Sequence, residues 1–232
     1  MSKPTETVLI VGASRGLGLG LAGEYARRGS RVIGTVRASN PPTGLHALAA
    51  EAVGMVRVEM VDINFQEQVL ALRQRLAGET IDLLFVNAGI SNGSGETVPG
   101  TTTEAFTTLM VTNALSPLRV IETLADLVPA DGVIAAMSSG LGSVANNTRA
   151  GWEVYRASKA ALNTMLRSFS VRRGGGRTVL AVTPGWVRTD MGGPSATLDI
   201  ETSVKGMVNA IAARRGKPGA AFVDYQGNDV PW

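Results

Sequence analysis

The sequence contains no cysteine and a single histidine, and these two absences exclude several kinds of chemistry. A chain without cysteine forms no disulfide and has no catalytic thiolate. His46 cannot build a metal site by itself, so we expect no bound metal. The lack of cysteine also fits a reducing compartment, and we expect a cytoplasmic protein.

Long apolar runs and a strong charge of one sign are missing as well. No stretch of about 18 apolar residues occurs, so we expect no membrane span. The first residues lack the apolar core of a signal peptide. The formal net charge is only +3, and the basic pairs Arg172-Arg173 and Arg214-Arg215 are not interleaved with aromatic residues. We therefore expect neither nucleic acid nor a membrane as a partner.

The chain is apolar and rich in glycine, and strand-like and helix-like segments alternate along it. Hydrophobic residues make up 44% of the 232 residues, enough to bury a substantial core. Short apolar runs alternate with helical patterns. The runs predict strands at 7–11, 31–36, 55–60, 81–86, 132–137, 177–183 and 220–223. The patterns between them predict helices that end near residue 28 and span 45–52, 65–77, 104–127 (with a kink at Pro117), 153–172 and 202–213.

Alternating strands and helices with continuously apolar strands are typical of a parallel sheet that is covered on both faces. We predict an α/β Rossmann fold. It is a single domain over residues 1–232, with a doubly wound, parallel, seven-stranded sheet. Loops at about 89–103 and 184–199 follow the carboxyl ends of strands, where such sheets bind their ligands.

A glycine-rich loop joins the first strand to the first helix. Gly12 permits a tight turn, Gly16 lets the backbone approach a pyrophosphate, and Gly18 lets the helix pack close to the sheet. The helix then offers free N–H groups to phosphate. Because this loop follows a strand and opens a helix, the motif predicts a bound dinucleotide.

The end of the second strand indicates which dinucleotide binds. An acidic residue there would select NAD, but the sequence has Val36 and Arg37. Arg37, and Arg15 within the glycine loop, are guanidinium groups that can pair with a 2′-phosphate. We therefore predict NADP(H) as the cofactor.

Tyr155 and Lys159 lie four residues apart in a helical pattern, which places both on one helix face. A phenol has a pKa near 10 and is a poor acid–base group at neutral pH, whereas a nearby ammonium lowers that pKa. The pair is suited to giving a proton to a carbonyl oxygen.

With these residues in place, the chain resembles the short-chain dehydrogenase/reductase family along nearly its whole length. The features it shares with the family include Gly12–Gly18, Asn87-Ala88-Gly89, Asn113, Ser138-Ser139, Tyr155 with Lys159, and the segment 184–189. The stretches around Tyr155, the segment 184–193 and the tail Ala-Phe-Val-Asp-Tyr are similar to the C-factor-like and sniffer-like carbonyl reductases.

The resemblance implies four catalytic residues. Tyr155 is the expected acid–base group, and Lys159 is expected to lower its pKa and hold the nicotinamide ribose. Asn113 is expected to tie Lys159 to a water chain. Ser138 and Ser139 compete for the substrate oxygen, and the Ser-x-x-Gly pattern from Ser139 to Gly142 favours Ser139.

The resemblance also implies cofactor contacts. They come from the glycine loop, the ends of four strands and the catalytic helix. The residues are Gly12, Ser14, Arg15, Gly16, Leu17, Gly18, Arg37, Asp62, Ile63, Asn87, Ala88, Gly89, Tyr155, Lys159, Pro184, Gly185, Val187 and Thr189. Two departures from the family pattern are Val11, where a threonine is usual, and a longer gap before Tyr155, which makes 140–152 a third substrate loop.

The leading prediction is an NADPH-dependent carbonyl reductase or alcohol dehydrogenase that acts on a small ketone or aldehyde. Two alternatives remain: a non-catalytic NADP(H)-binding signalling or sensor protein of the same fold, and a polyol or steroid-type dehydrogenase that acts oxidatively. The resemblance further implies a homodimer or homotetramer through the helices of residues 104–127 and 153–172. The substrate itself is not readable from loops of this kind.

Overall fold

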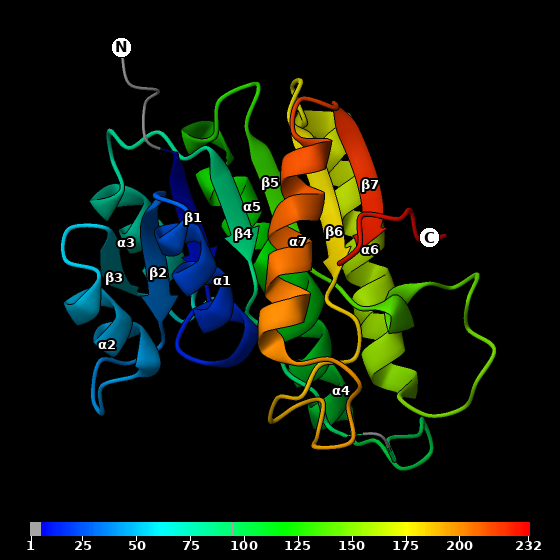
Figure 1. Ribbon diagram of the computed structural model, residues 1–232. Helices are drawn as coiled ribbons and strands as arrows, with labels where there is room; N and C mark the ends of the chain where they lie inside the picture. The colour runs from blue at the N-terminus through cyan, green and yellow to red at the C-terminus, as the bar shows by residue number, and fades with distance from the viewer. Residues whose placement is uncertain (1–5, 94) are drawn as a thin grey trace.

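The fold is built on one parallel sheet, seen in the computed structural model, which describes residues 6–93 and 95–232. Its strand order is β3-β2-β1-β4-β5-β6-β7 (Figure 1). The strands are β1 (Thr7–Val11), β2 (Arg31–Val36), β3 (Val56–Met60), β4 (Leu83–Val86), β5 (Val133–Met137), β6 (Thr178–Thr183) and β7 (Gly219–Asp224). The predicted seven-stranded, doubly wound sheet is confirmed.

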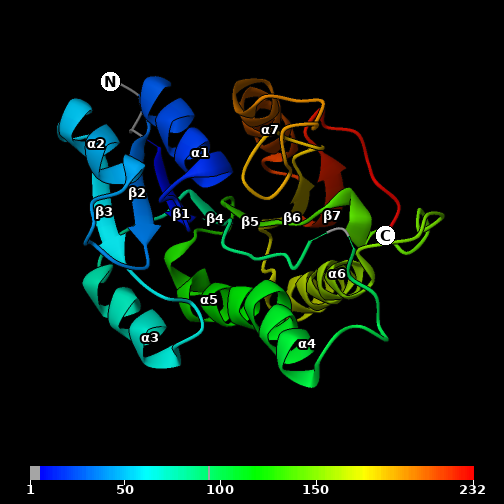
Figure 2. The same ribbon diagram turned by 90° about the horizontal axis from the view of Figure 1, so that it is seen from below.

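The helices form two layers on the sheet. They are α1 (Gly16–Arg27), α2 (Gly44–Glu51), α3 (Gln66–Arg75), α4 (Thr103–Met110), α5 (Ser116–Leu124), α6 (Glu153–Arg173) and α7 (Ile200–Arg214). Figure 2 shows α1, α2 and α7 on one face, and α3, α5 and α6 on the other, with α4 beyond α5. Because both faces are covered, all residues of β1, β4, β5 and β6 are buried.

One apolar cluster fills the space between the sheet and each of the two helix layers. Alternate residues of the strands point to opposite faces, so Val8 and Ile10 of β1 pack with α1 and α7, whereas Leu9 and Val11 pack with α3, α5 and α6. Strand β1 therefore contributes side chains to both apolar clusters.

The predicted helix over 104–127 is present as a continuous run of helical turns, but the type of turn changes along it. The structure divides it into α4, a π-helical turn η1 (Val111–Leu115), α5 and a short 3₁₀ turn η2 (Ala125–Leu127). Pro117 lies at the start of α5. A proline cannot donate to the carbonyl four residues earlier, which here is that of Asn113. The irregular turn therefore contains Asn113, and π turns of this kind are frequent at functional sites.

The register of the sheet places the predicted site residues at one edge. Val11 pairs with Val86, so the loop that begins at Gly12 and the segment that begins at Asn87 leave the sheet side by side. Among the residues that the structure describes, no helix is both long and apolar enough to cross a membrane. Within the same residues, no three metal-ligating side chains come together.

Candidate active site

The glycine loop is anchored to β2 by a threonine that sequence reasoning did not select. The amide of Gly12 donates to Thr35 Oγ1 at 3.0 Å, and the amide of Ala13 donates to the Thr35 carbonyl at 2.8 Å. Thr35 is buried within an apolar strand, and its polarity there is the signal that could have found it. It supplies a hydroxyl that orders the loop, although Val11 stands where the family has threonine.

Close backbone contacts explain two of the three glycines. Gly12 has φ +91°, and a Cβ there would lie 2.9 Å from the Ala88 nitrogen. A Cβ on Gly18 would lie 2.1 Å from the Gly12 oxygen. That oxygen also accepts a hydrogen bond from Asn87 Nδ2 at 2.7 Å. Asn87 and Ala88 are therefore part of the loop's support.

Gly16 differs because it faces open space. A Cβ on Gly16 would meet no atom of the described residues within 4 Å. The helix α1 that begins there has no side-chain cap and no acidic residue in its first turn. Its first amides are thus unpaired within the helix, and free amides at a helix N-terminus suit a pyrophosphate. The loop therefore fits the dinucleotide that the sequence predicts.

The two predicted phosphate-binding arginines differ in their surroundings. Arg37 is exposed just after β2, and it makes no ion pair in the part of the chain that the structure describes. Arg15 instead pairs with Asp190, which lies in the 184–199 loop. Both of those side chains are more than two-thirds exposed, so this ion pair contributes little to stability.

The two predicted cofactor residues that follow β3, Asp62 and Ile63, are held in place by nearby residues. The amide of Asp62 donates to Gln68 Oε1 at 2.8 Å, and its carboxylate accepts the amide of Asn64 at 3.0 Å. Ile63 is buried among the residues of the core beneath. The segment is thereby fixed at the carboxyl edge of the sheet.

The 184–199 segment is held at the same edge. The Pro184 carbonyl accepts from Ser203 Oγ of α7 at 2.7 Å, and a Cβ on Gly185 (φ +78°) would lie 2.6 Å from Leu198 Cδ1. Val187 is buried, and it pairs with Leu198 in an isolated bridge. Thr189 Oγ1 accepts the amide of Gly192 at 3.0 Å. The four predicted residues of this segment thus lie in an ordered loop.

Tyr155 and Lys159 lie one turn apart on α6, and both are buried. Lys159 Nζ donates to the Met137 carbonyl at 2.9 Å, and it lies 5.8 Å from the centre of the Tyr155 ring. The end of β5 and the helix α6 therefore hold the ammonium beside the phenol.

Burial, rather than charge, dominates the pKa values of the pair. Burial raises the pKa of Tyr155 to about 12, and a hydrogen bond with Ser139 acts in the opposite direction. Burial lowers the pKa of Lys159 to about 8. Desolvation is thus the larger effect on the pKa of Tyr155, and the Lys159 ammonium is directed at the Met137 carbonyl. The expected role of Lys159 in lowering the pKa of Tyr155 stays a prediction.

Asn113 is completely buried, and its amide is fully used. Its Oδ1 accepts the amide of Ile90 at 2.8 Å. Its Nδ2 donates to the Ile90 carbonyl at 2.9 Å and to Ser158 Oγ at 3.1 Å. A Cβ on Gly89 would lie 3.2 Å from Asn113 Oδ1 and 3.4 Å from Lys159 Nζ, so Gly89 lies between the two. Asn113 thus supports the strand end and α6, with no direct bond to Lys159.

The two candidate serines point in different directions. Ser138 is buried, and its hydroxyl donates to Asn163 Oδ1 of α6 at 2.7 Å. The Ser139 hydroxyl lies close enough to Tyr155 to lower the pKa of the phenol, and Ser139 Oγ accepts the amide of Leu141 at 3.1 Å. The structure therefore places Ser139, the serine favoured by the sequence pattern, beside Tyr155.

A small apolar cluster surrounds Tyr155. Tyr155 packs with Leu109, Val154 and Leu141. Trp152 also contacts Tyr155, with ring centres 5.5 Å apart and planes at 61°. This packing keeps water from much of the phenol and is the physical cause of its raised pKa.

Glu96 is a second residue that sequence reasoning missed. Its Oε2 accepts the backbone amide of Tyr155 at 2.8 Å. In return, Glu153 Oε2 accepts the amide of Val98 at 2.7 Å. Two carboxylate–amide hydrogen bonds therefore link the 89–103 loop to the start of α6. Glu96 acts as a helix cap, because the side chain of Trp152 at the cap position makes no capping hydrogen bond.

Comparison with known proteins decides the family. The model of the family described as short chain dehydrogenase matches residues 6–198. The chain belongs to the short-chain dehydrogenase family. The expected oxidoreductase class follows from that membership.

Three similar proteins place it more closely within the family. The protein named C-signal from Myxococcus xanthus is 42% identical over 66% of this chain and 93% of its own length. A short-chain dehydrogenase/reductase from Burkholderia multivorans, crystallised with bound NADP, is 49% identical with a TM-score of 0.96, over 99% of this chain and all of its own. The carbonyl reductase Sniffer of D. melanogaster is 28% identical with a TM-score of 0.87, over 98% of this chain and 100% of its own. The resemblance to this branch is confirmed.

Proposed function

We propose that this chain is an NADPH-dependent carbonyl reductase in which Tyr155 donates the proton. The observation that carries the proposal is the buried group at the ends of β4 and β5. There Ser139 lies beside Tyr155, while Asn113 Oδ1 and Lys159 Nζ both lie close to Gly89. Similarity to Sniffer, a carbonyl reductase, supports the same reaction.

The cofactor assignment rests on the glycine loop and on Arg37. The open space at Gly16 and the uncapped start of α1 suit the pyrophosphate. Arg37 would hold the 2′-phosphate, since no acid stands beside it and no ion pair occupies it within the described chain. Similarity to a structure with bound NADP supports the choice. When bound, NADPH would supply the hydride.

The protonation states suit reduction. A pKa raised to about 12 keeps Tyr155 protonated at neutral pH, so its phenol is ready to give a proton to a carbonyl oxygen. A pKa of about 8 leaves Lys159 mainly as the ammonium at pH 7, where it would stabilise the phenolate that is left. Ser139, beside Tyr155, would donate a hydrogen bond to the same substrate oxygen.

The other predicted residues would keep this geometry. Asn113 would fix the end of β4 against α6 through Ile90 and Ser158. The 184–199 segment, with Val187 and Thr189, would cover the nicotinamide end of the cofactor site. None of these residues needs to move a proton.

The deciding experiment measures NADPH oxidation over a panel of ketones and aldehydes with the wild type and with Tyr155→Phe. We expect a loss of kcat by about a thousandfold, within the range of general acid catalysis, while the Kd for NADPH stays within about twofold. Turnover that persists in Tyr155→Phe would refute the mechanism. For the cofactor, Arg37→Ala should weaken NADPH about tenfold or more and leave NADH unchanged, because a charged hydrogen bond contributes about 1.5–3 kcal/mol.

A second candidate is a signalling protein that uses the fold to bind NADP(H) without turnover. Similarity to C-signal favours it. Tight NADPH binding with no reduction of any carbonyl in the panel would support this candidate over the reductase.

A further inference from the structure

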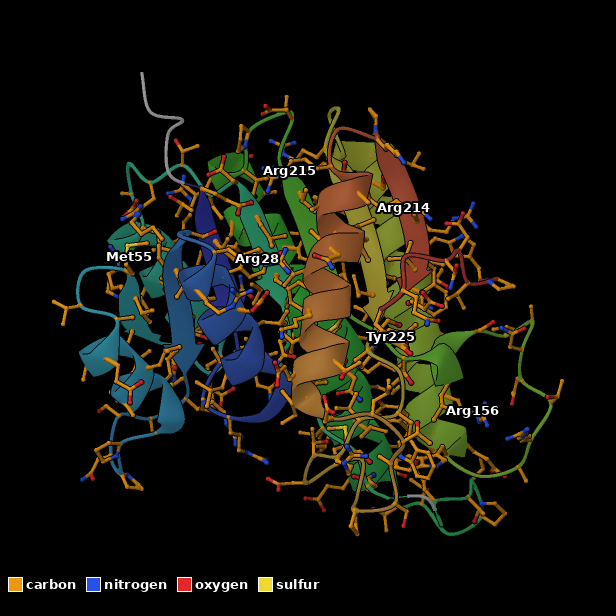
Figure 3. All side chains as sticks on the ribbon, viewed as in Figure 1. Arg28, Met55, Arg156, Arg214, Arg215 and Tyr225 are labelled. Carbon is orange, nitrogen blue, oxygen red and sulfur yellow. The ribbon has the colours of Figure 1, made fainter. Side chains whose placement is uncertain are left out.

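A cavity of about 410 Å³ lies on the side of α6 that carries Arg156. Its walls are the turn after Ser139, the segment 144–151 and the first turn of α6. The lining residues are Gly140, Leu141, Asn146, Thr148, Arg149 and Arg156. Figure 3 shows Arg156 on the side of α6 that faces the 143–152 segment, away from α7.

The charged side chains that line this cavity are all positive. Among the residues that the structure describes, two arginines line it and no acidic side chain does. Within the described chain, neither Arg149 nor Arg156 takes part in an ion pair, whereas many other arginines do. Arg156 Nε donates to the Gly151 carbonyl at 2.9 Å, which fixes the guanidinium of this cavity-lining residue through one of its five N–H groups. Two such groups without a carboxylate favour an anion.

The cavity adjoins the proposed reaction centre. Arg156 directly follows Tyr155 on α6, and Leu141 both lines the cavity and packs in the cluster that contains Tyr155. The Leu141 amide is bonded to Ser139 Oγ at 3.1 Å. One wall is therefore shared between the cavity and the serine–tyrosine pair.

We propose that this cavity binds an oxyanion, carboxylate or phosphate, carried by the carbonyl substrate. The proposal rests on the proposed function, since it names the substrate class of the same site. A planar guanidinium pairs with either oxyanion through two parallel hydrogen bonds. The enzyme would then prefer acidic aldehydes or ketones over their neutral counterparts.

The first test measures binding alone. Benzoate, benzamide and inorganic phosphate are titrated by calorimetry into the protein loaded with NADP⁺, for the wild type and for Arg149→Gln and Arg156→Gln. Arg119→Gln is the matched control, because Arg119 is exposed on α5 and outside the cavity. We expect benzoate to bind more tightly than benzamide. Each cavity variant should weaken benzoate about tenfold, the effect of losing one charged hydrogen bond, and the control should not.

Benzoate affinity that is equal in the wild type and both cavity variants would overturn the anion site. Retained folding is checked for each variant by its melting temperature and by its affinity for NADPH, so a misfolded variant is not counted.

The second test asks whether the anion belongs to a substrate. The kcat/KM for 4-formylbenzoate is compared with that for its methyl ester. We expect the wild type to favour the acid about tenfold and both cavity variants to lose this preference through KM, with unchanged rates on the ester. Benzoate should compete with the ester.

Arginine-dependent benzoate binding without competition would assign the cavity to a free anion and overturn its role for substrate. No reduction of any carbonyl by the wild type would overturn the proposed function. The benzoate titration would still report on the anion site in that case.

Discussion

Replacing Glu96 with alanine tests whether a loop far from Tyr155 in the chain holds the catalytic helix in place. The change removes the carboxylate that accepts the Tyr155 amide at 2.8 Å, and it also removes the partner of Asn92 Nδ2 at 3.0 Å. Trp152, at the cap position of α6, offers no side-chain substitute. The Tyr155 amide would therefore lose its charged acceptor.

The magnitude follows from two comparable interactions. Loss of a helix cap costs about 0.5–2 kcal/mol, and loss of a charged hydrogen bond costs about 1.5–3 kcal/mol. Glu96 is only half-buried, so water replaces part of the interaction, and we expect about 1–2 kcal/mol. For a chain of this size each kcal/mol shifts Tm by roughly 2–4 °C, so Tm should fall by about 2–8 °C.

The assay combines thermal unfolding with carbonyl reduction. We expect kcat to fall about tenfold as Tyr155 loses its fixed position, with the affinity for NADPH unchanged. Glu96→Gln, which keeps a carbonyl oxygen, should recover much of both losses. Glu51→Ala, an exposed acid at the end of α2, is the matched control. A Glu96→Ala protein with unchanged Tm and kcat would refute the reasoning.

Two further predictions concern α1. Gly18→Ala should abolish NADPH binding and lower Tm, because its Cβ would meet the Gly12 oxygen at 2.1 Å. The matched Gly23→Ala, whose Cβ would meet no atom of the described residues within 4 Å, should raise stability by about 0.5–1 kcal/mol, and calorimetric titration with thermal unfolding separates the two. Glu24 is buried, and hydrogen bonds from Arg27 and then Arg28 lower its pKa to about 2. Its contribution of roughly 2 kcal/mol after screening by solvent is therefore full above the unfolded-state pKa near 4.5 and disappears as pH falls toward 2. The Tm difference between the wild type and Glu24→Gln should accordingly be largest near pH 7 and be mostly lost once the pH reaches the folded-state pKa of about 2; a difference that does not depend on pH would contradict this assignment.

The sequence alone determined the local elements and the site's location. Period and composition placed β1 and β2 at their observed ends, because a strand buried on both faces must be continuously apolar. The spacing of Tyr155 and Lys159 fixed them on one face of α6, since four residues are about one helical turn. The roles of the individual site residues, the single domain, the cytoplasmic location and the oligomeric state stay predictions.

Only the tertiary structure decided the contacts between distant segments. Ser138 and Ser139 are adjacent in sequence, and it is the extended chain after β5 that turns one toward Asn163 and the other toward Tyr155. The partners of Thr35 and Glu96 are not readable from the local sequence, because each side chain accepts a backbone amide that lies at least 23 residues away. Periodicity in the sequence shows only which face of an element is buried. The residues that pack around Tyr155 come from segments that are distant in sequence and meet at the carboxyl end of the sheet. The burial that raises the pKa of Tyr155 therefore depends on the tertiary structure.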